Sequence, residues 1–156
     1  MKANEIEDGK VLMIGDLVIG CIETDTVGDA TYKIPCKVTD INHYGDVICE
    51  SLKSFPDELD WQDGDDFSWI EAIPLTAEIL EKNGFPLDVE ETNHPLYKGT
   101  EIKEYIISMP PNGYKEHLIW NGEYYIMFDS PKVRIDYVHQ LQHALRLCGI
   151  DKEIVL

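Results

Sequence analysis

The chain has 156 residues, of which 30 are Asp or Glu and 13 are Lys or Arg, so its formal net charge at pH 7 is −17. A field this negative repels phosphate groups, so we expect no direct contact with a nucleic-acid backbone and no docking onto an anionic membrane. Hydrophobic residues make up 44% of the chain, which excludes a disordered polypeptide and predicts one folded domain or two small ones.

Five short apolar runs, with no helical pattern between them, occupy the first 74 residues. They cover 11–14, 16–22, 32–41, 47–52 and 67–73. The turn cluster 42–46 joins two of these runs into a hairpin, and Pro35 predicts an edge position or a bulge within it. The pattern predicts an SH3-like small β-barrel over residues 1–74.

A short helix with complete end signals is expected next, over 77–83. Thr76 is the predicted N-cap, because its hydroxyl is placed to accept a bond from the first turn. Gly84 is the predicted left-handed residue after the helix, which lets Phe85 fold back on Leu80. The preceding junction has no flexible-linker composition, so we expect the second half, 75–156, to pack closely on the first.

Three further strands are expected after a polar loop over 86–95. They cover 100–108, 114–120 and 123–128. Asn121 and Gly122 separate the last two runs and predict a type I′ hairpin, because that turn needs positive φ at both positions. The pattern therefore predicts a helix, an antiparallel meander and a helix in the second half, and an α+β fold for the whole chain.

The last expected helix begins after Asp136, its predicted N-cap, with Ser130-Pro131 as an earlier candidate. Its apolar stripe consists of Val138, Leu141, Leu145 and Cys148. Gly149 ends the helix, and the tail 151–156 is interpreted as a possible edge strand.

Four cysteines occur, Cys21, Cys36, Cys49 and Cys148, without a C-x-x-C pair. That spacing matches neither a zinc ribbon nor a thioredoxin-type motif, so we expect reduced, buried thiols. The acidic start of the chain has no apolar core of a signal peptide, and no run approaches the ~18 apolar residues of a membrane helix. These features predict a cytoplasmic protein, and nothing in the chain predicts a cofactor.

His139 and His143 are the one pair with metal-ligand spacing, since positions i and i+4 lie on one face of a helix. A zinc protease would need Glu directly after the first histidine, where this chain has Gln140. Two ligands are also fewer than the three of a catalytic zinc site, although His117, His94 or an acid could supply another. We interpret the pair as ordinary helix histidines and predict no metal, with a metal-dependent enzyme as an alternative.

Residues 57–66 form an acidic loop around Trp61. Its acids are Asp57, Glu58, Asp60, Asp63, Asp65 and Asp66. The spacing does not fit an EF-hand, because aligning Gly64 with the loop glycine puts Leu59 and Ile70 at ligand positions. An aromatic anchor with a charged rim suits contact with a basic protein, whereas the alternative is a solvated loop whose Trp61 covers one end of the barrel.

The chain contains neither a G-x-S-x-G nucleophile motif nor a glycine-rich phosphate loop. We therefore expect a non-enzymatic protein-binding or adaptor protein with a basic partner. A second hypothesis is an acidic DNA mimic that occupies the basic groove of a nucleic-acid enzyme, which would lay out its carboxylates at phosphate spacing.

Three segments carry a resemblance to other proteins: 12–18 (LMIGDLV), 73–85 (IPLTAEILEKNGF) and 137–150 (YVHQLQHALRLCGI). They resemble a group of small uncharacterised proteins of gut Bacteroidetes, often encoded near phage or other mobile elements. The resemblance implies a cytoplasmic protein of a bacterium or its mobile elements. It implies no activity, cofactor or catalytic residue.

Overall fold

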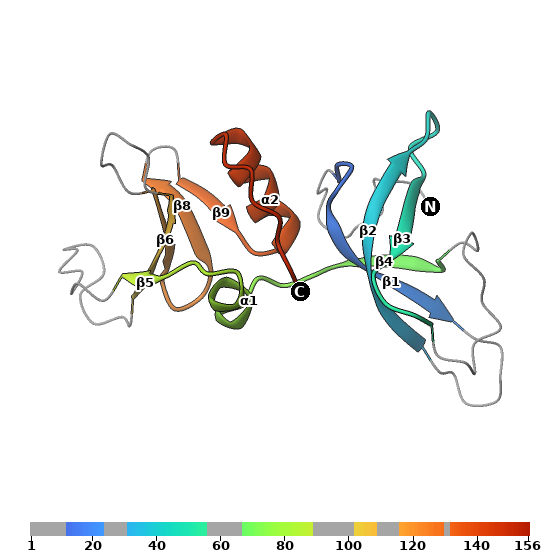
Figure 1. The fold of residues 1–156 in the computed structure, drawn as a ribbon, viewed down its shortest axis with the longest axis horizontal. Coiled ribbons are helices and arrows are strands. Elements are labelled where there is room, and N and C mark those ends of the chain that lie inside the picture. The colour runs from blue at the N-terminus through green and yellow to red at the C-terminus, as the bar shows by residue number, and fades with distance from the viewer. Residues whose placement is uncertain (1–11, 24–30, 56–66, 89–101, 109–115, 130–131) are drawn as a thin grey trace. The chain divides into compact units, whose positions relative to one another are not determined.

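A computed structural model describes residues 12–23, 31–55, 67–88, 102–108, 116–129 and 132–156 (Figure 1). The chain divides into two compact units, 1–73 and 74–156, which are described separately. The described residues form an α+β fold with two antiparallel sheets and two helices. Neither helix is long and apolar enough to cross a membrane.

The first unit is a four-stranded antiparallel sheet (Figure 1). Its strands are β1 (Leu17–Glu23), β2 (Thr31–Ile41), β3 (Val47–Ser51) and β4 (Trp69–Ala72), in the order β3-β2-β1-β4. Alternate residues of β2 turn to one side of the sheet, as the sequence pattern predicts. They join a buried apolar core of Leu12, Val18, Ile22, Ile34, Cys36, Val38 and Ile70.

The prediction of a closed SH3-like barrel is wrong for the described residues. The sheet is open, with β3 and β4 at its two edges. Part of the reason lies in the expected strand 11–14, whose residues 12–14 lead into a turn instead. Gly15 has a φ of 90° there and bends the chain into β1, so these residues do not form a fifth strand.

Pro35 lies in β2, an inner strand of the sheet, and the expectation of an edge position is wrong. The last residue pair between β2 and β3 is Cys36 with Ser51, so Pro35 lies one residue past that ladder. Its carbonyl still accepts a bond from the N–H of Leu52, at 2.9 Å. The missing N–H of proline therefore falls where β3 has ended, and the irregularity of this strand pair lies near Thr39 instead.

The second unit combines a five-stranded antiparallel sheet with two helices. Its elements are α1 (Ala77–Lys82), β5 (Leu87–Asp88), β6 (Lys103–Ser108), β7 (Glu116–Trp120), β8 (Tyr125–Asp129), β9 (Lys132–Ile135) and α2 (Val138–Leu147). The strands pair in chain order, from β5 to β9. Tyr105, Leu118 and Met127 stand opposite one another on successive strands and are buried, together with Leu80, Leu141 and Leu145 of the helices.

Both predicted end signals of α1 and the predicted glycine at the end of α2 are confirmed. The hydroxyl of Thr76 accepts a bond from the N–H of Ile79 at 3.3 Å. Gly84 has a φ of 69°, and the N–H of Phe85 donates to the carbonyl of Leu80 at 3.0 Å. Gly149 ends α2 in the same way, also with a φ of 69°. Glycine relieves both turns because a Cβ would strain this backbone conformation.

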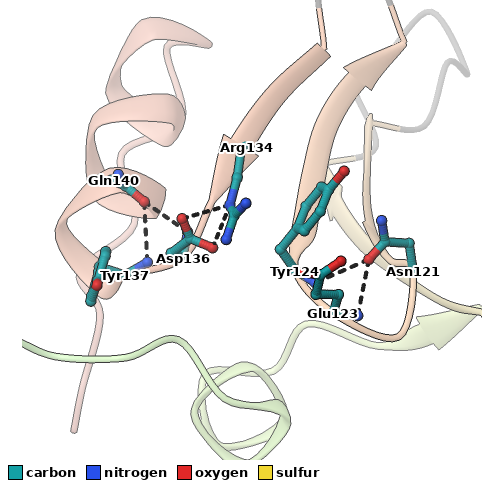
Figure 2. A network of polar contacts seen from close by, with 7 residues as sticks. All are labelled: Asn121, Glu123, Tyr124, Arg134, Asp136, Tyr137 and Gln140. Atoms are coloured by element: carbon teal, nitrogen blue, oxygen red, sulfur yellow. Dashed lines mark hydrogen bonds and ion pairs between the residues drawn. The ribbon is translucent and has the colours of Figure 1, made fainter. Parts of the chain in front are cut away.

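The start of α2 differs from the prediction by one residue. Tyr137 is the N-cap, and the side-chain oxygen of Gln140 accepts bonds from the N–H groups of Asp136, at 2.7 Å, and Tyr137, at 3.2 Å (Figure 2). Before it lies β9, a strand that the sequence pattern missed because its four residues are too few to show a period. Arg134 on this strand binds both carboxylate oxygens of Asp136 and lies 4.3 Å above the Tyr124 ring.

The hairpin between β7 and β8 is confirmed, but its turn is longer than a two-residue type I′ turn. Trp120 pairs with Tyr125, which leaves four residues in the loop. The side-chain oxygen of Asn121 accepts bonds from the N–H groups of Glu123 and Tyr124, at 3.1 and 3.0 Å (Figure 2). Asn121 therefore organises the loop through its side chain.

The tail 151–156 does not form the expected strand. Instead, the side chain of Asn83 binds both the N–H and the carbonyl of Val155, at 2.7 and 2.8 Å. The Lys82 amine donates to the carbonyl of Leu156, and Ile154 is buried. The tail is thus held at the C-terminal end of α1 by the residue that caps that helix.

Candidate functional site

One end of the first sheet exposes a group of apolar side chains. The turn before β1 and the turn between β2 and β3 lie at the same end, because the strands are antiparallel. The exposed fractions are 46% for Met13, 60% for Ile14, 74% for Tyr44 and 48% for Ile48. These four residues are called the apolar end below.

The turn that carries Met13 and Ile14 is held by a buried carboxylate. Asp16 is fully buried, and its side chain accepts a bond from the N–H of Met13 at 2.8 Å. The N–H of Gly15 donates to the carbonyl of Val38 at 2.7 Å and ties the turn to β2. These bonds fix the backbone, so the two apolar side chains are presented outward on a rigid turn.

The hairpin turn that carries Tyr44 is organised by one asparagine. The side-chain oxygen of Asn42 accepts bonds from the N–H groups of Tyr44 and Asp46, both at 2.9 Å. The Asn42 amide also donates to the Asp46 carboxylate at 3.0 Å. The ring of His43 lies 3.8 Å from that of Tyr44, centroid to centroid. The exposed aromatic ring therefore stands on a second rigid turn.

The apolar end is acidic. Segments 12–16 and 39–48 contain three carboxylates, Asp16, Asp40 and Asp46, and no Lys or Arg. Asp16 is enclosed in its turn, whereas Asp40 is exposed and Asp46 half-buried. An apolar surface bordered by carboxylates, without a basic residue in either segment, is complementary to an apolar surface bordered by cations.

The structure places the predicted histidine pair on α2, with their rings side by side. The ring centroids of His139 and His143 lie 5.8 Å apart, edge to face, and the Tyr137 ring stacks on that of His139. His139 is only 1% exposed. Among the described residues no three His, Cys, Asp or Glu side chains lie close enough together to hold a metal ion. The geometry adds no ligand to the pair.

His117, a predicted third ligand, lies on β7 and faces a carboxylate instead. Its Nδ1 is 3.3 Å from Oε2 of Glu104, a mostly buried residue of β6. Glu104 stands opposite Ile119, two residues from His117, so the two side chains meet diagonally on one face of the sheet. Strand register decides this pair, so the spacing of the two residues in the chain does not indicate it. His94 lies outside the described residues.

Three of the four thiols are poorly suited to nucleophilic chemistry. Burial raises the pKa of Cys21 and of Cys36 to about 11 and that of Cys49 to about 12. The thiolate is the reactive form, so these groups are almost wholly protonated at neutral pH. The expectation of buried thiols holds for Cys21 and Cys36, whereas Cys49 is half-buried. Cys148 is exposed and lies one residue past the end of α2, at its C-cap.

The acidic loop around Trp61 lies outside the described residues, so its role as a partner contact stays a prediction. The apolar end was not predicted as a site. The turn cluster 42–46 was a visible signal, but nothing in the sequence shows that Tyr44 is exposed or that Met13 lies at the same end. Exposure depends on which strands pair.

No protein-family model matches the chain, and neither a curated protein nor a solved structure matches it. The resemblance to the Bacteroidetes proteins therefore stays a prediction, and function is argued from geometry and charge.

Proposed function

We propose that the protein is a non-enzymatic binding protein whose apolar end contacts a basic protein partner. One observation carries the proposal: three exposed apolar side chains stand on two hydrogen-bonded turns, and a fourth, Ile48, lies on β3 beside them, at one end of the first sheet. Protein interfaces combine an apolar centre with a polar rim, and contiguous exposed apolar surface is typical of them.

The rigidity of the two turns favours binding. A surface that is already ordered loses less conformational entropy when a partner docks, so more of the contact energy appears as affinity. Asp16 and Asn42 supply that order through side-chain bonds to the backbone.

The net charge of −17 favours a basic partner over an acidic one. Charge of this size accelerates association with a cationic protein, and this attraction weakens as salt screens the charges. We therefore expect a partner with an apolar protrusion and a rim of Lys or Arg.

Capture from a bacterial lysate tests the proposal when it is made with matched variants. The test variant combines Ile14→Ser with Tyr44→Ser. The control combines Leu147→Ser with Val133→Ser, which removes two exposed apolar side chains from the second unit. Wild type and control should capture the same basic protein at about 0.05 M salt, and capture should fall steeply at about 0.5 M.

The test variant should capture at least about tenfold less of the partner than wild type does, since a central apolar contact contributes more than about 1.4 kcal/mol in many interfaces. Equal capture by the test and control variants would contradict the proposal. So would the absence of a basic protein among those captured.

A further inference from the structure

The strand β3 is an open edge of the first sheet. It pairs with β2 on one side, and no described strand pairs with its other side. An edge of this kind presents unpaired N–H and C=O groups, onto which another extended chain can add as a strand.

The hydrogen bonds at the two ends of β3 show which of its backbone groups face outward. The carbonyl of Asp46 accepts from Asn42, and the N–H of Leu52 donates to Pro35, so both of these residues point their backbone groups toward β2. Bonding alternates along an antiparallel strand, so residues 48 and 50 also face β2. The backbone groups of Val47, Cys49 and Ser51 therefore face outward.

The side chains of β3 protect this edge with a single charge, that of Glu50. Natural proteins commonly guard an edge strand with lysine or another inward-pointing charge. The edge strand β9 of the second sheet carries Lys132 and Arg134, whereas β3 carries Glu50 and no basic residue. Ile48 and Leu52, on either side of Glu50, are 48% and 47% exposed.

The negative charge of the chain favours a basic segment over a second copy of the chain as the partner of β3. The described residues 37–55 contain two basic residues, Lys37 and Lys53, and three acids, Asp40, Asp46 and Glu50, and the whole chain has a net charge of −17. A second copy of the chain would bring the same charge against this strand and be repelled. An extended segment rich in Lys or Arg would be attracted.

We propose that β3 binds an extended basic segment of a partner by strand addition. This inference rests on the proposed function and specifies the form of the partner: an extended chain that alternates basic and apolar residues. Its main chain would bond to the outward groups of Val47, Cys49 and Ser51. Side chains alternate between the two faces of a strand, so its cations would lie on the exposed face with Glu50. Its apolar side chains would lie on the opposite face with Val47 and Cys49, which pack against the core.

Hydrogen exchange of single amides, followed by NMR on the full chain, tests the proposal with defined probes. The probe is a synthetic peptide of alternating lysine and valine. One control peptide carries glutamate in place of lysine, and the other carries N-methyl groups on alternate amides. The lysine peptide should slow exchange at Val47, Cys49 and Ser51 by at least about tenfold and change Ile48 and Glu50 little. Both control peptides should have no such effect.

A charge reversal at the edge provides a matched pair of variants. Glu50→Lys should weaken binding of the lysine peptide at least about tenfold, because it gives β3 the kind of guard that β9 carries. Glu123→Lys makes the same charge change at an exposed position of the second unit and should leave binding nearly unchanged. Thermal melts of both variants show whether each remains folded.

Three results would overturn strand addition: slow exchange at the three amides without peptide, protection that grows with protein concentration alone, or binding that survives N-methylation. The first would show that the chain itself covers the edge, and the second that another copy does. Capture that depends on Ile14 and Tyr44 without protection of β3 would leave the proposed function standing and remove this inference. Protection of β3 by the peptide without capture from the lysate would leave strand addition standing and remove the proposed function.

Discussion

Both units expose apolar side chains, but they differ in what their hydrogen-bonded polar side chains hold in place. The second unit caps both of its helices, holds its tail on Asn83 and carries two basic residues on its edge strand β9. In the first unit, polar side chains bond to the backbone of two turns, and those turns expose Met13, Ile14 and Tyr44. In the second unit, side-chain hydrogen bonds hold helix ends and the tail. In the first unit, they hold two turns that carry exposed apolar residues. We infer that recognition belongs to the first unit.

The largest expected difference between the units lies in thiol reactivity. At about pH 8, an aromatic disulfide reagent should modify Cys148, which is exposed, quickly. Cys21, Cys36 and Cys49 should react at least about 100-fold more slowly than an ordinary exposed thiol, because burial raises their pKa from 9.0 to about 11 or 12 and leaves much less thiolate. Mass spectrometry of digested protein identifies the labelled residue. Early labelling of Cys36 would contradict the packing of the first core.

A larger residue at Gly20 should destabilise the first unit. A Cβ placed there would lie 2.4 Å from Cε1 of Phe67, far inside van der Waals contact. Gly20→Ala should lower the free energy of unfolding by about 1–3 kcal/mol, the usual cost of overpacking. Urea unfolding followed by fluorescence measures the change. Gly20→Ala combined with Phe67→Leu should recover part of the loss, and no recovery would mean that the ring is not the cause.

Two asparagines with similar roles compare the units directly. Asn83→Ala should cost about 1–3 kcal/mol, because it leaves both backbone groups of Val155 without their bonds beside a buried residue. Asn42→Ala should cost less, about 0.5–1.5 kcal/mol, since water replaces its bonds to the exposed hairpin. Urea unfolding of the two variants ranks them. The reverse order would contradict the view that the tail completes the second unit.

The smallest expected effect is the pH dependence from Glu71 in the first unit. Its carboxylate binds the Lys33 amine at 2.6 Å and the Trp69 indole N–H at 3.1 Å, and both bonds lower its pKa from 4.5. A folded pKa below the unfolded value adds stability that is complete above about 4.5 and is lost as the pH falls through the folded pKa. Glu71→Gln should flatten the stability curve below pH 5 slightly, because the pair is exposed and screened. Urea midpoints across pH 3–6 test this, and an unchanged acid slope would contradict it.

Local signals in the sequence predicted the parts of the fold that local chemistry controls. Thr76 and Gly84 mark the ends of α1 because a hydroxyl and a residue without Cβ satisfy helix ends wherever the helix lies. The alternation in β2 and the hairpin to β3 were predicted for the same reason. The four-residue strand β9 and the two-residue strand β5 were missed, because so few residues show no period.

The candidate site was harder to predict than the fold. His139 and His143 do share one side of α2, as their spacing indicates, yet only packing buries the first of them. The same i, i+4 pattern would suit a surface or an interior. Glu104 and His117 are 13 residues apart in the chain, and only the register of β6 and β7 makes them neighbours.

The sequence by itself determined the charge of −17, the ends of α1, the alternation of β2 and the turn at 42–46, since each depends on residues close together in the chain. Only the tertiary structure decided that the first sheet stays open and that β3 lies at an edge. It also decided that Asp16 is buried, where its carboxylate bonds to the turn that exposes Met13 and Ile14. Exposure and edge position depend on which strands pair across long separations, and residue types constrain that pairing weakly.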